Sequence, residues 1–377
     1  MSQKTPENLD ELLLKVIEMN GSDLHLAVGT KPRVRVYGDL TDIPGYDVIS
    51  QSVVAEKVIY SIPVMDTYAR GIVNTSGQFD CGYTLVVDKN TRYRFRINVF
   101  RQKGDLSCVC RKLNEKIPDY NTLGLPNSIF NLYRKRRGLI LIVGPTGSGK
   151  STTLASFLRI INQSLPKHII TLEEPIEYIH WSMKSTVSQR EIGIDCDTFP
   201  NGVRAALRED PDVILIGEMR DLETTQTAIE AAETGHLVCS TLHTLGVAET
   251  TTRIIDMYPF EQQRQIQSQL ASILEAVVSQ QLLPKADKSG YVVAYEVLYK
   301  NKTIQDLIRE GNTTALAQYL DTKEAKQAGM VSMDSTIYRL FSNGIIDKTT
   351  ALDYAFDRKK MEQTIESLRN AKIKATK

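Results

Sequence analysis

Apolar residues follow helical and strand-like patterns along the chain, and the strand-like pattern changes from alternating to unbroken. Near the N-terminus, Leu9, Leu12, Leu13 and Val16 recur at helical spacing. Strand-like alternation follows at residues 24–28, 34–36, 83–87 and 92–100. Later the apolar runs are short and unbroken, as expected of parallel strands covered on both faces. These runs lie at residues 139–143, 169–172, 213–216 and 237–241.

Turn residues divide the chain further. Proline and glycine residues, among them Pro118, mark a linker at residues 116–126. We expect an α/β domain before the linker, at residues 1–115, and a second α/β domain at residues 127–290. The remainder, at residues 291–377, is expected to be mainly helical. Helical spacing predicts helices at residues 152–161, 261–283 and 303–309.

A glycine-rich segment directly follows the first unbroken apolar run. It reads Gly-Pro-Thr-Gly-Ser-Gly-Lys-Ser, the pattern of a phosphate-binding loop between a strand and a helix. Its glycines let successive backbone N–H groups turn toward a phosphate, and the helix adds the positive end of its dipole. Lys150 is expected to reach the β- and γ-phosphates, and the Ser151 hydroxyl to bind Mg²⁺. We predict a site for ATP and Mg²⁺ that comprises Gly144, Pro145, Thr146, Gly147, Ser148, Gly149, Lys150, Ser151 and Thr152.

The other apolar runs each end in polar residues. Glu173 and Glu174 follow the second run, Glu218 follows the third and His243 the fourth. Ligands of open parallel sheets bind beyond the carboxyl ends of the strands, so these side chains are expected to converge on the phosphate loop. Glu218 would polarise the attacking water or bind Mg²⁺ through water, and Glu173 and Glu174 would offer a second acidic position. His243 would contact the γ-phosphate, or be a structural residue of its turn.

One predicted strand carries arginines on a single face. Arg92, Arg94 and Arg96 recur at every second residue, whereas apolar residues occupy the opposite face. Like charges in such a row repel unless water screens them or an anion neutralises them. The row is therefore either a solvated face or a source of arginines for the nucleotide.

Composition excludes several classes of protein. Lys and Arg number 46 against 45 Asp and Glu, so no overall charge attracts nucleic acid. No apolar stretch is long enough to cross a bilayer, and the N-terminus lacks the apolar segment of a signal peptide. A cytoplasmic location is expected. The five cysteines form no metal-binding pattern and are expected to be reduced, buried side chains.

Together these motifs resemble the type II/IV secretion ATPase superfamily, and within it the type IV pilus retraction ATPases of the PilT family. The resemblance rests on the phosphate loop, the acidic box at 171–177, the segment 207–221 and the histidine box at 235–244. The N-terminal strings at 22–26 and 94–98 are similar as well.

The resemblance implies a PAS-like N-terminal domain joined to a RecA-like ATPase core. It implies a hexameric ring with ATP between the N- and C-terminal domains, Glu218 as catalytic glutamate, and action of Arg94 and Arg96 on the nucleotide. The implied function is Mg²⁺-dependent ATP hydrolysis that drives pilus retraction, pilin disassembly and twitching motility. The implied partner is a pilus platform protein at the inner face of the cytoplasmic membrane, and nucleic acid is not a partner.

Two departures from the family pattern keep alternatives open. Glu174 stands where relatives commonly have aspartate, and the first half of the retraction motif is altered at residues 303–306. The chain could thus be an accessory retraction ATPase that acts beside a second pilus ATPase. A nucleotide-dependent regulator that does not hydrolyse ATP is the other alternative.

Overall fold

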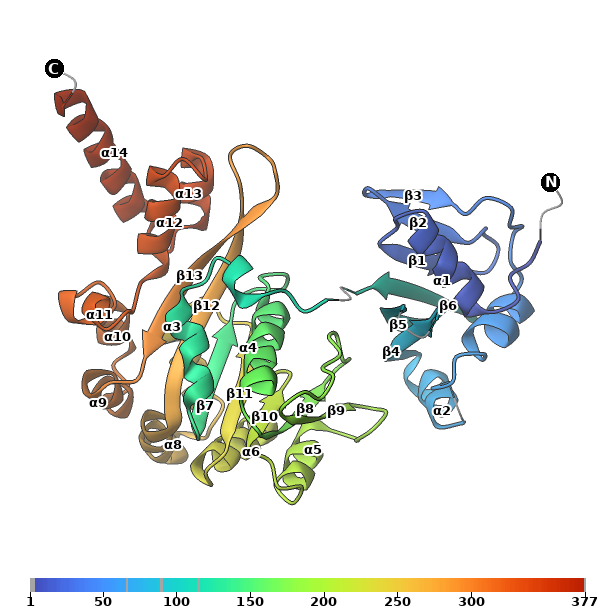
Figure 1. Cartoon of the computed structure of the whole chain (residues 1–377), viewed down its shortest axis with the longest axis horizontal. Helices are drawn as coiled ribbons and strands as arrows, with labels where there is room; N and C mark the ends of the chain where they lie inside the picture. Colours follow the sequence, from blue (N-terminus) through green and yellow to red (C-terminus); the bar gives the residue numbers. More distant parts are fainter. Residues whose placement is uncertain (1–3, 66, 89–90, 114–115, 376–377) are drawn as a thin grey trace. The chain divides into compact units, whose positions relative to one another are not determined.

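The computed structural model describes residues 4–65, 67–88, 91–113 and 116–375 (Figure 1). By its contacts the chain forms two compact units. The first runs to Ile117 and includes Glu173–Ile179 and Gln189–Thr198. The second comprises the intervening segments and the rest of the chain, from Pro118 onward.

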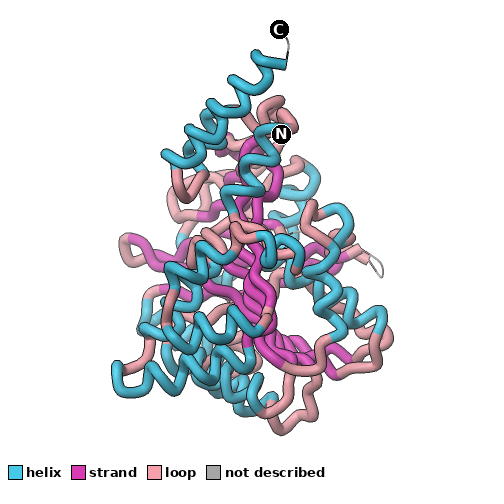
Figure 2. The backbone as a smooth tube through the Cα atoms, turned by 90° about the vertical axis from the view of Figure 1, so that its left-hand side faces the viewer, coloured by secondary structure: helices cyan, strands magenta, loops and turns pink. Residues whose placement is uncertain are grey.

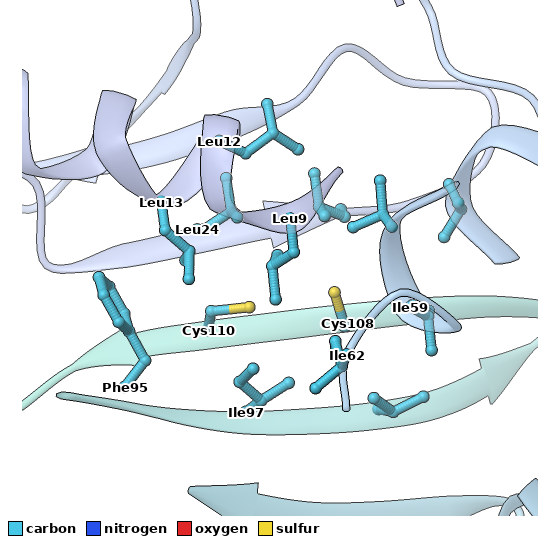
Figure 3. Close-up of a cluster of buried hydrophobic side chains, with 14 of the residues drawn as sticks. Leu9, Leu12, Leu13, Leu24, Ile59, Ile62, Phe95, Ile97, Cys108 and Cys110 are labelled. Carbon is cyan, nitrogen blue, oxygen red and sulfur yellow. The ribbon is translucent and has the colours of Figure 1, made fainter. Parts of the chain in front are cut away.

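The first unit contains a six-stranded antiparallel sheet in the order β3-β2-β1-β6-β5-β4. Apolar residues at helical spacing make α1 pack on this sheet, and Figure 3 shows Leu9 and Leu13 pointing toward Cys108 and Cys110 of β6. The elements are α1 (Leu9–Glu18), β1 (Asp23–Leu26), β2 (Arg33–Val36), β3 (Asp39–Asp42), a π-helix (Val53–Ile59), α2 (Thr67–Ser76), β4 (Gln78–Val86), β5 (Arg92–Gln102) and β6 (Asp105–Lys112).

The predicted first helix and the four predicted strands of this unit are confirmed as α1, β1, β2, β4 and β5. Sequence patterns did not indicate β3, β6 or the helices between residues 53 and 76. The sequence also predicts a hairpin turn at residues 88–90, between β4 and β5, and Lys89 and Asn90 lie outside the described residues. All five cysteines are free thiols; four are buried, as predicted, and Cys196 is half-buried. Burial raises the pKa of Cys81 and of Cys239 to about 12.

The second sheet has seven strands in the order β13-β12-β7-β11-β10-β8-β9, and its twist is visible in Figure 2. The strands from β12 to β8 in this order run parallel, with β13 antiparallel to β12. The predicted unbroken runs are confirmed as buried parallel strands. The strands are β7 (Gly138–Val143), β8 (His168–Glu173), β9 (Thr186–Glu191), β10 (Val213–Ile216), β11 (Leu237–Leu242), β12 (Leu274–Pro284) and β13 (Tyr291–Tyr299).

Helices connect these strands. The predicted helix at residues 152–161 lies within α4, which begins at Lys150. Short helical turns precede β7 at Tyr120–Thr122, α3 (Asn127–Phe130) and Asn131–Arg134. The longer connections contain α4 (Lys150–Ser164), α5 (Phe199–Ala206), α6 (Leu222–Glu233), α7 (Val247–Asp256) and α8 (Phe260–Ile273).

The prediction of one helix over residues 261–283 is wrong in its second half. Helix α8 ends at Ile273, and Leu274–Pro284 is strand β12. This strand pairs with β7 on one side and β13 on the other, so tertiary pairing decides its conformation. Short apolar runs do not distinguish a buried strand from a buried helix by spacing alone. The expected boundary at residue 290 separates the two strands of this hairpin.

The C-terminal part is helical, and the predicted helix at residues 303–309 is confirmed as α9. A cluster of buried apolar side chains joins α12, α13 and α14 to the β12–β13 hairpin. None of the helices in the described residues is both long and apolar enough to cross a membrane. The helices are α9 (Lys302–Glu310), α10 (Thr313–Tyr319), α11 (Lys323–Gln327), α12 (Met333–Ser342), α13 (Lys348–Tyr354) and α14 (Arg358–Ala375).

Adjacent leucines of α1 allow a test of this packing. Leu13 is fully buried, whereas Leu14 is 37% exposed. We expect Leu13→Ala to lower the free energy of unfolding of the first unit by about 2–5 kcal/mol, because it leaves a cavity. Leu14→Ala should change it by no more than about 0.5 kcal/mol. Urea unfolding followed by circular dichroism measures both; equal effects would contradict the burial pattern.

Candidate nucleotide site

The phosphate loop leaves the buried strand β7 and enters α4, in the predicted order of strand, loop and helix. Gly144, Gly147 and Gly149 have φ values of 143°, 80° and 89°, in the region that favours glycine. Gly144 also lacks room for a side chain, because an added Cβ would lie 2.2 Å from the carbonyl oxygen of Gln280. The loop is therefore shaped by backbone dihedrals and by close contact with β12.

The groups around this loop fit an anion. Lys150 is 9% exposed, and its Nζ donates to the carbonyl oxygens of Gly144 at 2.8 Å and Pro145 at 3.1 Å. The Ser148 hydroxyl is buried and has no hydrogen-bond partner among the described residues. A buried ammonium, an unsatisfied hydroxyl and the N-terminus of α4 are together typical of a phosphate site. Ser151 and Thr152 lie in the first turn of the helix.

Among the described residues, no group of three or more His, Cys, Asp or Glu side chains could hold a metal ion by itself. When Mg²⁺ binds together with a nucleotide, substrate phosphates supply most of its ligands and the protein adds one or two oxygens. Ser151 is exposed at the start of α4, and its part in binding Mg²⁺ stays a prediction.

Strand register brings two of the predicted residues together. The N–H of Gly217 donates to the carbonyl oxygen of Leu172 at 2.8 Å, and the N–H of Met219 donates to the carbonyl oxygen of Thr241 at 3.0 Å. Strands β8, β10 and β11 therefore end at the same edge of the sheet. There Nε2 of His243 lies 3.5 Å from Oε2 of Glu218. The N–H of Gly144 donates to Leu242 at 3.3 Å, which places the start of the phosphate loop beside the residue before His243.

Two residues at this edge had no predicted role. Nε of Arg220 lies 2.5 Å from Oε2 of Glu218, whose side chain is 10% exposed, so the guanidinium compensates a largely buried charge. Its place two residues after the strand-end glutamate was the signal that could have found it. The buried Oε1 of Gln280 has no partner among the described residues. Gln280 was missed because its strand was expected to be a helix.

The acidic residues of β8 lie where the sequence predicted a strand end. Glu173 is the last residue of β8, and its Oε1 accepts a hydrogen bond of 3.1 Å from Nε2 of Gln189. Glu174 follows and is exposed. Their part in binding metal or water stays a prediction.

The arginines of β5 have partners within the first unit. Arg94 is 14% exposed, with its Nη2 2.7 Å from Oε2 of the buried Glu191 and its Nε donating to the carbonyl oxygen of Ile176. Arg96 is 44% exposed and lies 3.4 Å from Asp80. The expected alternation is confirmed, since Phe95 between them is fully buried. Action on a nucleotide stays a prediction for both arginines.

The chain is similar to known secretion and pilus proteins. The sequence model of the "Type II/IV secretion system protein" family matches residues 2–341. The type IV pilus retraction ATPase PilT of Pseudomonas aeruginosa is 38% identical over 352 residues, covering 92% of this chain and 98% of that protein. A twitching motility protein of Neisseria gonorrhoeae is 39% identical over 330 residues, covering 88% of this chain and 85% of that protein.

The fold is likewise similar to a solved structure, that of the pilus retraction motor PilT with bound ADP. The TM-score is 0.85 at 41% identity, and the match covers 94% of this chain and 99% of that chain. The predicted α/β fold class is thereby confirmed. From the family match, the relatives and this structure it follows that the chain belongs to the type II/IV secretion system protein family, and that within the family it is a P-loop ATPase.

Proposed function

We propose that this chain hydrolyses ATP with Mg²⁺ and uses the energy to drive type IV pilus retraction, the removal of pilin that underlies twitching motility. The observation that carries the proposal is the 3.5 Å pairing of Glu218 with His243 beside the phosphate loop. The phosphate loop alone would only bind nucleotide. Glu218 adds a candidate base beside it, and His243 adds a candidate contact to the γ-phosphate. The names of the pilus relatives support the choice of pilus retraction.

Each residue of the site has a proposed part in the reaction. Backbone N–H groups of residues 144–149 and the Lys150 ammonium bind the phosphates. The Ser151 hydroxyl, and Glu218 through water, would hold Mg²⁺, which when bound neutralises charge on the phosphate oxygens. Glu218 accepts the proton of the attacking water, and His243 contacts the γ-phosphate. Glu173 and Glu174 supply further acidic oxygens for water or metal.

Assembly completes the proposal. A hexameric ring would let Arg94 and Arg96 of the N-terminal domain act on the nucleotide, so that activity depends on assembly. The motor would work in the cytoplasm, against a platform protein at the inner face of the membrane. The altered residues 303–306, at the start of α9, favour as second candidate an accessory ATPase beside another pilus ATPase. Deletion in the host separates the two, because loss of the main retraction motor leaves hyperpiliated cells that do not twitch.

Removing the lysine of the phosphate loop should remove nucleotide binding. Lys150→Ala takes away the cation that faces the phosphates, and we expect the affinity for a fluorescent ATP analogue to fall by about a hundredfold, on the order of 3 kcal/mol. Lys348→Ala, at an exposed position of α13, is the control and should bind like the parent chain. Unchanged affinity of the Lys150 variant would exclude the loop as the nucleotide site.

The proposed base can be tested without loss of binding. Glu218→Gln keeps the size of the side chain but not its basicity, and we expect phosphate release to fall by about 10²–10⁴ with nucleotide affinity preserved. The control is Glu223→Gln on α6, a 62% exposed residue paired with Arg204. Full turnover in the Glu218 variant would remove this residue from its proposed part.

Arg94 and Arg96 of β5 should behave differently when they are replaced. Arg96→Ala is expected to cost at most about 1 kcal/mol of stability, because its ion pair is exposed, but to lower turnover by about 10³. Arg94→Ala leaves the Glu191 carboxylate buried without its cation and should destabilise the chain by about 3–5 kcal/mol. Thermal unfolding and phosphate release measure these effects. Parent-like turnover in Arg96→Ala would mean that this face is only solvated.

A further inference from the structure

The turn that carries His243 is held in place by several hydrogen bonds. We call residues 243–246, between β11 and α7, the His243 turn. In this turn the N–H of Leu245 donates a hydrogen bond of 2.9 Å to Oε2 of Glu249. The carbonyl oxygen of Leu245 accepts one of 3.1 Å from Oγ of Ser279. Oγ1 of Thr250 donates to the carbonyl of Gly246 at 2.6 Å. Two of these partners belong to α7, so the position of the turn depends on where α7 begins.

One buried carboxylate determines where two helices begin. Glu296 of β13 is 6% exposed. Its Oε1 accepts a hydrogen bond of 2.7 Å from the N–H of Val247, the first residue of α7, and its Oε2 accepts one of 3.2 Å from the N–H of Met333, the first residue of α12. Helix N-termini carry unpaired N–H groups and a positive dipole end, which makes them good partners for a carboxylate. Glu296 therefore connects the start of α7 with the start of α12.

Burying the carboxyl group of Glu296 without a cation beside it costs free energy, which argues against an incidental contact. In the part of the chain that the structure describes, no lysine, arginine or histidine pairs with Glu296, and burial raises its pKa. Asp334 and Asp321 also raise the pKa of Glu296, whereas the hydrogen bonds from the N–H groups of Val247 and Met333 lower it. A buried carboxylate persists in such a place when both of its oxygens are used.

The C-terminal helices reach the His243 turn at a second point. Asp334 of α12 accepts hydrogen bonds from the N–H groups of Phe356 at 2.7 Å and Asp357 at 3.0 Å. The Phe356 ring lies over Gly246, where an added Cβ would be 3.2 Å from Cε2 of the ring. Gly246 has an ordinary extended φ of −159°, so what it provides is room for this ring.

We infer that Glu296 is a positioning residue for His243. It contacts the N-terminus of α7, and through this contact the packing of helices α12 to α14 affects the position of His243 beside Glu218. The inference rests on the proposed function, in which His243 acts in ATP hydrolysis. A shift of α12 would move Met333 against Glu296, and the same carboxylate would transmit the shift to Val247 and the His243 turn. The C-terminal helices thus act on turnover without touching the nucleotide.

The decisive variant is Glu296→Gln in the full chain. Glutamine keeps one acceptor oxygen but presents an NH₂ group to the second N–H donor, so one helix loses its contact. We expect turnover at saturating ATP to fall about tenfold with the affinity for a fluorescent ATP analogue within about twofold of the parent. The matched control is Glu275→Gln, a buried glutamate of the neighbouring strand β12 held by Lys135 and Lys300. It should lower thermal stability and leave turnover below the unfolding transition unchanged.

A double-mutant comparison separates positioning from general destabilisation. If Glu296 acts through His243, then Glu296→Gln should lower turnover much less in a His243→Ala background than in the parent chain. Equal losses in both backgrounds would overturn the inference. If the Glu296 variant does not fold, Phe356→Ala replaces it, because the 48% exposed ring can be removed without emptying a core.

A second readout does not need turnover. With ¹³C-labelled histidine, the ring resonance of His243, assigned by its loss in His243→Ala, should shift in Glu296→Gln and Phe356→Ala but not in Glu275→Gln. An unmoved resonance in the Glu296 variant would overturn the inference. A parent chain that releases no phosphate would instead contradict the proposed function, while parent-like turnover in Glu296→Gln contradicts only the part given to Glu296.

Discussion

The pairing of β7 with β11 is the constraint on which the nucleotide site depends. Val143 and Leu242 face each other as the last pair of these parallel strands, so the phosphate loop and the His243 turn leave the sheet side by side. The next strand, β10, is in register with β11 and delivers Glu218 to the same edge. The register of these strands thus brings polar side chains from three separate segments to one edge of the sheet.

Buried acidic side chains connect loops and helix ends that do not take part in strand pairing. Glu275 binds Lys135 and Lys300, Glu191 binds Arg94, and Glu296 binds the first N–H groups of two helices. Each would be costly to bury alone, and each joins segments far apart in the sequence. Apolar contacts are non-directional, whereas hydrogen bonds to a carboxylate require particular distances and angles. The positions of loops and helix ends therefore depend on these residues.

The phosphate loop was easier to recognise in the sequence than strand β12 beside it, for physical reasons. The phosphate loop is local, because its glycines and Lys150 lie within one turn and need no distant partner to be recognised. The strand at Leu274–Pro284 could not be distinguished from a helix, because its conformation comes from pairing with β7 and β13. Gln280 and Glu296 were missed because their significance arises from contacts across the fold, whereas Arg220 pairs with Glu218 only two residues away and could have been found. The pairing of Arg94 with Glu191, 97 residues away, was equally invisible.

The close approach of β12 to the phosphate loop has an evolutionary consequence. The carbonyl oxygen of Gln280 leaves no space for a side chain at Gly144, so the sheet forbids a larger residue there whether or not a nucleotide ever binds. Selection for a stable protein would preserve this glycine even in a descendant that had lost its enzymatic activity. The presence of this glycine in a related sequence is for this reason weak evidence of ATPase activity. The presence of both Glu218 and His243 is more informative.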